Sequence, residues 1–362
     1  MSNPERYPTQ QERLAPRNST GHVFLAHLTD QEIADHIAGL DRATLDRMAG
    51  NYFPGTQIAE HFLSVTETLD IAKANFEVQK FPLMAVMPGE MDDEPQAVPV
   101  PGKVAMVRTD TGHALGVAGE NYGVVQNLEA FAAASVLAED RVFDIRSVQV
   151  VNGGSRVRIS GLIGASTIDQ LGRGPDVLAH FGVFEAAHDG IHSVTGSLET
   201  IRLVCLNGMT ARTKATSFKV RHTSRSQDRV RLAQESLLSI EQAARAEVDI
   251  FAELAQQRMS LKEFRSFAEK LLDDVRGEID EEASASKKTR RESAINELDE
   301  FFRHGDGNQG VSRYDAYNAI TEWVTARKDA AKDAIEFAKR FESATCGYNA
   351  RIKTRALAML KR

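Results

Sequence analysis

The chain has 362 residues, of which 42% are hydrophobic and 7% aromatic, values typical of a globular protein with a substantial core. Its 44 Lys and Arg residues are outnumbered by 51 Asp and Glu residues, which gives a net charge of −7 at pH 7. This balance excludes a uniformly basic nucleic-acid coat, so any basic surface must be local. At roughly 100 to 200 residues per domain, the length predicts two structural units.

Cysteine usage and the apolar pattern indicate the compartment. Cys205 and Cys346 are the only cysteines, so the sequence predicts neither a disulfide framework nor a thiolate zinc site, and a reducing environment is expected. No apolar run approaches the roughly 18 residues of a membrane-spanning helix, and the polar start of the chain lacks the apolar stretch of a signal peptide. We therefore expect a cytoplasmic protein.

The first hundred residues contain few patterns of regular structure. Residues 1–25 include three prolines among polar residues, and we expect a flexible tail there. Thr29 and Glu32 fit a capping box, which predicts a small helix through Leu40. Residues 88–101 hold four prolines and four acidic residues, which predicts an acidic surface loop.

Short β-type runs separated by turns follow as far as residue 206. The clearest is a hairpin whose two strands flank the turn Asn152-Gly153-Gly154. Alternation in its second strand places Val157 and Ile159 on one face and Arg156 and Arg158 on the other. The expected strands are Val142–Val151 and Arg156–Ile163 in this hairpin, and Val104–Met106, Leu115–Val117, Tyr122–Val125, His180–Ala187, Ile191–Leu198 and Leu203–Leu206 around it, with a helix from Asn127 to about Leu137.

Beyond residue 225, glycine and proline nearly disappear and apolar residues recur with a helical period. The pattern predicts one long amphipathic helix, or two, reaching Val275. Three further segments are expected: a helix near Ile295–Arg303 after a polar stretch, a Gly-rich loop at 305–310, and a helix from Ser312 to Ala344 that begins with a Ser312–Asp315 capping box.

These patterns predict an α+β fold, with an antiparallel β-hairpin and meander core, an intervening helix, and a long helical C-terminal region. We expect a flexible tail over 1–25, a core domain over 26–225 and a helical region over 226–362. The apolar anchors of the helical region are too numerous for exposed helices. They must pack on each other, on the β core or on another subunit, and we expect a homo-oligomer.

The segment 212–231 is the most informative part of the chain. It contains seven Lys or Arg residues and one acid, Asp228, in a chain that is acidic overall. Such a local excess gains most from an anionic partner, and a phosphate backbone is the obvious one. A solvated strand and helix start, or ion pairs with acids elsewhere in the fold, would explain it equally simply. The candidate nucleic-acid-binding residues are Arg212, Lys214, Lys219, Arg221, Arg225 and Arg229, with Arg156 and Arg158 extending the same surface.

Other candidate chemistry is weak. His180, His188 and His192 do not have a convincing metal-ligand spacing, and His188 begins a good turn sequence, His-Asp-Gly. Tyr122 and Phe143 offer rings for base stacking, but single aromatic residues in strands more often belong to the core. The chain contains no glycine-rich phosphate loop, zinc-protease motif or nucleophile elbow. We expect no enzyme, no catalytic residues, no metal and no cofactor.

Several short blocks resemble a known family. The blocks, in chain order, are Leu115-Gly116, Tyr122-Gly123-Val124-Val125-Gln126-Asn127, Arg202-Leu203-Val204-Cys205-Leu206-Asn207, Val220-Arg221-His222-Thr223 and Asn318-Ala319-Ile320-Thr321-Glu322-Trp323. In order and spacing they resemble the phage/plasmid-like family of unknown function, which is found on bacteriophages, prophages and conjugative plasmids. The resemblance covers roughly residues 100–340 and implies origin in a mobile element, without a known activity or catalytic residues.

The order of hairpins, basic segment and helices also resembles the phage single-strand annealing proteins, which assemble into rings or filaments on single-stranded DNA. Our leading hypothesis is therefore a non-enzymatic protein of a mobile element that binds single-stranded DNA in recombination or replication, with annealing as one form of that role. The alternative is an interaction factor whose C-terminal helices bind a host or phage protein, with the basic segment facing an acidic partner surface. No membrane association is expected.

Overall fold

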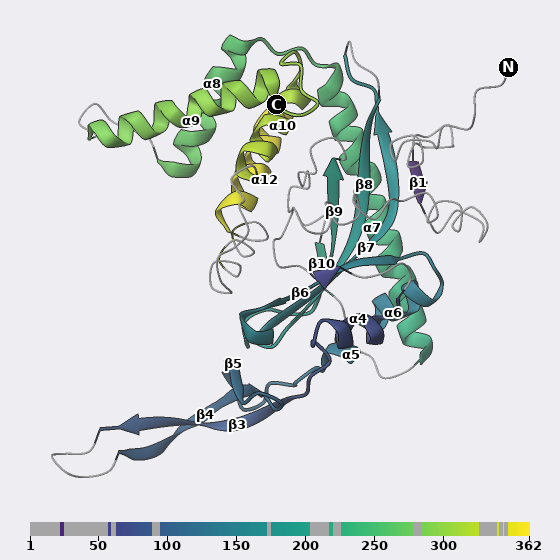
Figure 1. The fold of residues 1–362 in the computed structure, drawn as a ribbon, viewed down its shortest axis with the longest axis vertical. Coiled ribbons are helices and arrows are strands. Elements are labelled where there is room, and N and C mark those ends of the chain that lie inside the picture. The colour runs from purple at the N-terminus through teal and green to yellow at the C-terminus, as the bar shows by residue number, and fades with distance from the viewer. Residues whose placement is uncertain are drawn as a thin grey trace.

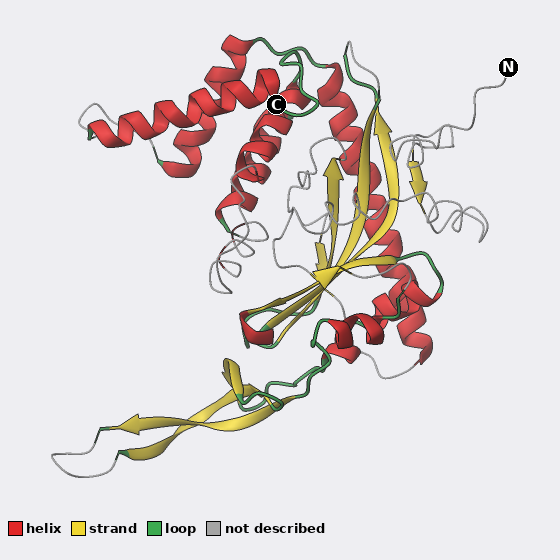
Figure 2. Cartoon of the chain, viewed as in Figure 1, coloured by secondary structure: helices red, strands yellow, loops and turns green. Residues whose placement is uncertain are grey.

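The computed structural model describes residues 22–24, 57–58, 63–88, 95–171, 175–202, 217–219, 226–277, 284–325, 339, 343 and 347–362. The small helix expected near residues 29–40 and the strand expected at Leu203–Leu206 lie outside these ranges. Within them the α+β expectation is confirmed, because two antiparallel sheets are followed in the chain by helices (Figure 2).

The larger sheet is antiparallel and has the strand order β10-β9-β8-β7-β6-β2, with β1 paired to β7. The hairpin expected around Asn152 is confirmed as β6 and β7, with Val150 opposite Val157 and Val148 opposite Ile159. Residues 22–24, which we expected in the flexible tail, pair with β7 instead. The strands are β1 His22–Phe24, β2 Gln57–Ile58, β6 Asp144–Val151, β7 Arg156–Ile168, β8 Asp176–Ala187, β9 Thr195–Arg202 and β10 Ser217–Lys219.

The smaller sheet forms an arm that extends away from the body of the molecule (Figure 1). It has the strand order β3-β4-β5, with β3 at Val78–Met87, β4 at Gln96–Arg108 and β5 at His113–Gly119. The turn expected between Val104–Met106 and Leu115–Val117 is confirmed. Residues 96–101, which we expected in a surface loop, belong to β4, and residues 96–99 pair with β3 across the arm.

Three short helices lie where the arm meets the body: α4 at Val65–Ile71, α5 at Asn127–Ala130 and α6 at Ala132–Glu139. The helix expected from Asn127 is therefore present but interrupted at Phe131. The expected strand at Tyr122–Val125 is wrong, since these residues form neither helix nor strand. The side chain of Gln126 instead binds the backbone of Val78 in β3, which ties this segment to the root of the arm.

The helical region begins with α7 at Ser226–Gln256 and α8 at Leu261–Arg276, so two helices occupy the segment where we expected one or two. Ser260 separates them and forms a capping box with Glu263. The described residues after α8 include α9 at Ala285–His304, α10 at Arg313–Thr325 and α12 at Tyr348–Leu360. Helix α9 starts ten residues before the expected Ile295, and the Ser312–Asp315 capping box of α10 is confirmed.

Two main hydrophobic clusters organise the body. One lies between the sheet, α4, α6 and the first half of α7, and the other among α8, α9, α10, α12 and the second half of α7. Ile240 and Ala244 of α7 belong to the first cluster, whereas Phe251 and Leu254 belong to the second. The helical anchors are thus largely buried within one chain. None of the described helices is long and apolar enough to cross a membrane.

Candidate nucleic-acid interface

The basic segment is bracketed by two elements of the structure. Strand β10 pairs with β9 at the edge of the larger sheet and ends at Lys219, which lies opposite Thr195. Helix α7 begins at Ser226 and carries Arg229 in its first turn. The structure therefore places these two predicted residues at a sheet edge and at a helix start. The other four residues of the segment, Arg212, Lys214, Arg221 and Arg225, lie outside the described ranges.

Arg156 and Arg158 are on the face of β7 that alternation predicted, but that face is covered. The two residues are only 6% and 3% exposed. Arg156 pairs with Glu185 of β8 at 2.5 Å, and Arg158 pairs with Glu199 of β9 at 2.5 Å. We expected an exposed basic surface here. The structure instead gives these arginines carboxylate partners, as a charge removed from water requires.

Neighbouring candidates also lie in the interior. Arg146 of β6, on the strand next to β7, is also buried and pairs with Asp144 of its own strand. Phe143 is fully buried and packs edge-to-face on Phe184, with ring centroids 5.6 Å apart, so it belongs to the core. Tyr122 is half-buried, and its hydroxyl lies 3.5 Å from the carbonyl oxygen of Ala187. Base stacking is therefore not available to Phe143.

The three histidines do not converge on one site. His180 is fully buried between Ser166 and Thr200, whose hydroxyls lie 2.7 and 3.0 Å from its ring nitrogens. His192 pairs with Asp189 at 2.6 Å in the β8–β9 connection. Among the described residues, no group of three His, Cys, Asp or Glu side chains is placed to hold a metal ion.

His188 is also buried, and its Nε2 donates a hydrogen bond of 2.8 Å to Asn127 Oδ1. The Asn127 amide in turn donates to the carbonyl of Ala74 at 2.7 Å, which fixes its orientation. Burial lowers the pKa of His188 to about 4, because the cationic ring would lose its hydration, and nearby Asp189 offsets only part of that cost. This network joins the end of β8 to the helices at the root of the arm.

Arg202, which opens one of the recognised sequence blocks, has a structural role. It is fully buried and pairs with Asp176, which also accepts a hydrogen bond of 2.9 Å from the hydroxyl of Tyr314 in α10. Its guanidinium group donates to the carbonyl oxygens of Asp306 and Gly307, at 2.9 and 2.8 Å. The Gly-rich loop at 305–310 thus caps the arginine and joins the sheet to the helical region.

A cationic hollow between α8 and α9 was missed by the sequence analysis. It has a volume of about 240 Å³ and is lined by Leu272, Asp273, Arg276, Gly277, Lys287, Arg290 and Arg291. Arg291 forms a two-pronged pair with Asp273, at 3.0 and 2.8 Å. The sequence signal for this hollow is the run Lys-Lys-Thr-Arg-Arg at 287–291, which lies in the polar stretch before the helix expected near Ile295. Arg276, on the opposite side of the hollow, belongs to α8, and only the fold brings it beside the residues of α9.

Comparison with known proteins identifies a family for this chain. No curated protein and no solved structure matches the chain. A family model described as a domain of unknown function, DUF932, matches residues 114–345, which is well over half of the 362 residues. The matched region starts after β4, so the long strands of the arm precede it. The resemblance to an uncharacterised family is thus confirmed, and the protein belongs to the DUF932 family.

Proposed function

We propose that this protein binds single-stranded DNA through the basic segment 212–231, without catalysing a reaction. The observation that carries the proposal is the charge of this segment, seven Lys or Arg against one acid in a chain of net charge −7. Local cationic excess of this kind attracts a polyanion and releases its counterions on binding. With Arg156 and Arg158 paired inside the sheet, the proposed contacts are Arg212, Lys214, Lys219, Arg221, Arg225 and Arg229.

The elements around the segment support contact with phosphates. Helix α7 starts immediately after Arg225, and the first amide groups of a helix carry a partial positive charge that favours anions. Lys219 ends β10, which lies at the edge of the larger sheet. A strand edge and a helix start on either side of a short connection offer a basic path along which an extended backbone can run.

The biological setting is part of the proposal. The sequence blocks that resemble the phage/plasmid-like family support a role on a mobile element, in recombination or replication. The likeness in element order to single-strand annealing proteins supports single strands over duplex DNA. The alternative, an interaction factor that uses its C-terminal helices, has less support, because the apolar faces of α8, α9, α10 and α12 are buried in one cluster.

Fluorescence anisotropy with labelled single- and double-stranded DNA at two salt concentrations tests the proposal. We expect tighter binding to single strands, with log K falling by about 0.7 per neutralised phosphate against log salt. The triple variant Lys219→Ala, Arg221→Ala and Arg225→Ala should weaken binding to every sequence alike. It should also flatten the salt slope by about 2 units, since three phosphate contacts are lost.

A control variant that loses the same number of charges shows whether DNA binding depends on segment 212–231 or on the total charge of the protein. The triple variant Lys262→Ala, Lys270→Ala and Lys361→Ala removes three exposed cations elsewhere and should leave the salt slope unchanged. Both variants should unfold cooperatively close to the wild type, because surface charge changes shift stability by under about 0.5 kcal/mol. Absence of wild-type binding to either DNA at low salt would refute the proposal. Unchanged affinity in the first variant would move the contact away from this segment.

A further inference from the structure

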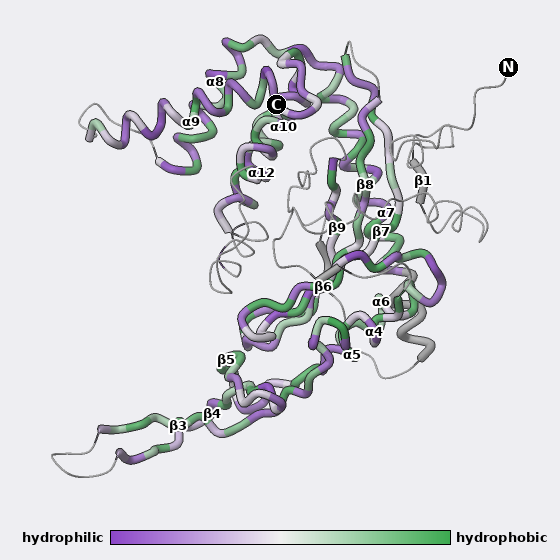
Figure 3. The backbone as a smooth tube through the Cα atoms, in the orientation of Figure 1, coloured by the Kyte–Doolittle hydropathy of each residue, from purple (hydrophilic) through white to green (hydrophobic). Residues whose placement is uncertain are grey.

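The arm formed by β3 and β4 exposes apolar side chains on both of its faces. In the outer part of the arm, Met84 and Val86 point to one face, and Val98 and Met87 point to the other, because directly paired residues share a face. They are 44%, 68%, 46% and 56% exposed, respectively. An antiparallel ribbon with one solvated face would alternate apolar and polar residues. Hydrophobic stretches run along both strands in Figure 3.

A two-stranded ribbon with apolar residues exposed on both faces is stabilised when another element packs on those faces. β5 pairs with β4 only over Lys103–Arg108, so the outer part of the arm has two strands. An isolated two-stranded ribbon is at best marginally stable in water unless a further strand or helix packs on it. Large apolar patches that stay exposed in one chain usually mark a contact with another molecule. We therefore expect another molecule to pack on both faces of the arm in the functional protein.

The root of the arm carries the complementary apolar surface. Of the eleven large apolar residues that are exposed in the described part of the chain, five lie on β3 and β4, and four lie on elements at the arm's root. These four are Ile71 in α4, Val117 in β5, Leu128 in α5 and Ile191 in the β8–β9 connection.

Direct contacts tie these elements to the arm. Arg108 of β4 donates to the carbonyl of Lys73, two residues after Ile71. The backbones of Val117 and Gly190 are in close contact. The exposed apolar residues of α4, β5 and the β8–β9 connection thus lie on elements that are held at the base of the arm.

Two connections of the chain carry opposite charge. Residues 89–94, which connect β3 to β4 at the outer end of the arm, contain four acids and no base. Residues 220–225, which connect β10 to α7, contain two arginines and no acid. The first half of α7 packs in one cluster with α4 and α6, at the end of the body from which the arm extends (Figure 1). One chain thus contains an acidic and a basic connection of opposite charge, which favours association between two copies.

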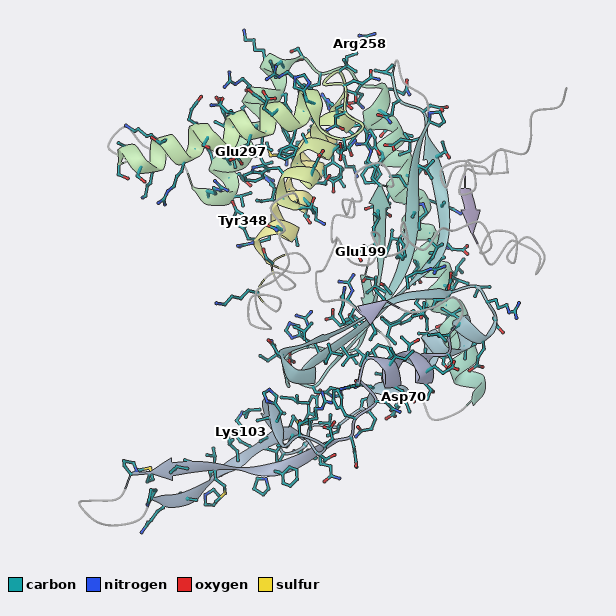
Figure 4. All side chains as sticks on the ribbon, in the orientation of Figure 1. Asp70, Lys103, Glu199, Arg258, Glu297 and Tyr348 are labelled. Atoms are coloured by element: carbon teal, nitrogen blue, oxygen red, sulfur yellow. The ribbon has the colours of Figure 1, made fainter. Side chains whose placement is uncertain are left out.

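We propose that the partner of the arm is a second copy of this chain, with each arm lying across the arm root of the other copy. The arm leads away from its own body, so it is placed to meet another body; Figure 4 places Lys103 on the arm and Asp70 beside its root. When each arm packs on the arm root of the other copy, both subunits use the same surface, and the result is a dimer with two-fold symmetry. The exposed apolar residues of β3 and β4 in one copy then pack on the exposed apolar residues at the arm root of the other copy.

The prolines of the arm define how the contact is made. Pro82 lies in β3, and Pro99 and Pro101 lie in β4. Proline has no backbone N–H to add to a ladder, and prolines on edge strands oppose the addition of further strands. The second copy is therefore held by the side-chain faces of the arm, and not by extension of its sheet. This separates the contact from edge-to-edge aggregation.

Light scattering coupled to size-exclusion chromatography, without DNA, tests the contact independently of the proposed function. We expect the wild type to have twice the 39.8 kDa mass of the chain at micromolar concentration. The arm variant Met84→Glu, Val86→Glu and Val98→Glu should be monomeric, and so should the root variant Leu128→Glu with Ile191→Glu. The control Leu238→Glu with Leu261→Glu changes exposed apolar residues of α7 and α8 and should remain dimeric.

Mixing identifies the partner as a second copy. The arm variant keeps an intact root and the root variant keeps an intact arm, so their mixture restores one of the two contacts and should form a heterodimer. Circular dichroism shows whether each variant is folded. A wild type that is monomeric at every concentration measured, or an assembly that survives the arm variant, would overturn the proposal. A larger assembly that dissolves in both variants would support the contact but not its two-fold closure.

Discussion

Arg156 and Arg158 are buried cations whose ion pairs could not be predicted from the neighbouring sequence. Alternation placed Arg156 and Arg158 on one face of β7, and the structure agrees. Their partners Glu185 and Glu199 belong to β8 and β9, and no local pattern links them to β7. Breaking one partner of such a buried pair usually costs about 3 to 5 kcal/mol, so these arginines matter for stability. Arg156 and Arg158 are therefore not available to DNA, and the proposed contacts are the cations of segment 212–231.

His188 predicts a pH dependence of stability. Its pKa is about 4 in the folded protein, below the ordinary value of about 6.5 expected in the unfolded chain. As pH falls through this window the unfolded state takes up a proton that the folded state does not, so stability decreases. Between pH 7.5 and pH 5, we expect this residue to lower the free energy of unfolding by about 2 kcal/mol.

Urea unfolding at the two pH values measures this effect. The variant His188→Gln keeps an amide donor toward Asn127 but cannot titrate. We expect it to be less stable than the wild type at pH 7.5, yet to lose about 2 kcal/mol less between pH 7.5 and pH 5. Carboxylates contribute equally to both proteins and cancel in the comparison. An identical pH dependence in the two proteins would show that His188 does not titrate as a buried neutral ring.

At the scale of elements, β5 is fixed to the body by close backbone approach. A Cβ atom at Gly116 would lie 2.6 Å from the carbonyl carbon of Asp189, so only glycine fits there. Gly119, near the end of the same strand, has nothing within 4 Å of the corresponding position. Gly116, the glycine of the Leu115-Gly116 block, is thus required by close packing in this chain. The β5 strand positions the root of the arm against the β8–β9 connection.

The variants Gly116→Ala and Gly119→Ala therefore form a matched pair. We expect Gly116→Ala to destabilise the protein by about 1 to 3 kcal/mol, because the backbone of Asp189 must shift to admit the methyl group. Gly119→Ala should change stability by less than about 0.5 kcal/mol. Chemical denaturation of both variants measures the difference. Equal stabilities would mean that β5 can move away from the β8–β9 connection at little cost.

At the scale of the whole molecule, α7 joins the two cores. Its first half packs on the sheet and its second half packs among the C-terminal helices. The buried Arg202 cluster makes a second link, between β9 and the loop that precedes α10. A boundary between residues 225 and 226 therefore separates two kinds of secondary structure, while α7 itself contributes to both hydrophobic cores.

We therefore predict a single cooperative unfolding transition. Trp323 is the only tryptophan and lies in α10, so its fluorescence reports on the helical cluster. The infrared band of β-strands reports on the sheets. The two signals should change with the same midpoint on heating, because unfolding of either core exposes one half of α7. Separate midpoints would show that α7 breaks between Ala244 and Val248 and that the two cores unfold independently.

The sequence by itself determined what depends on local chemistry. Glycine turns, period-2 alternation and capping residues predicted the β6–β7 hairpin, the change to helices after residue 225 and the start of α10, because each is decided by neighbours in the chain. The tertiary structure decided what depends on distant partners. Only the fold pairs Arg158 with Glu199, brings Arg276 beside Arg290, and turns a proline-rich segment into a strand of the arm. Burial and long-range pairing arise between residues far apart in the chain, where no local pattern records them.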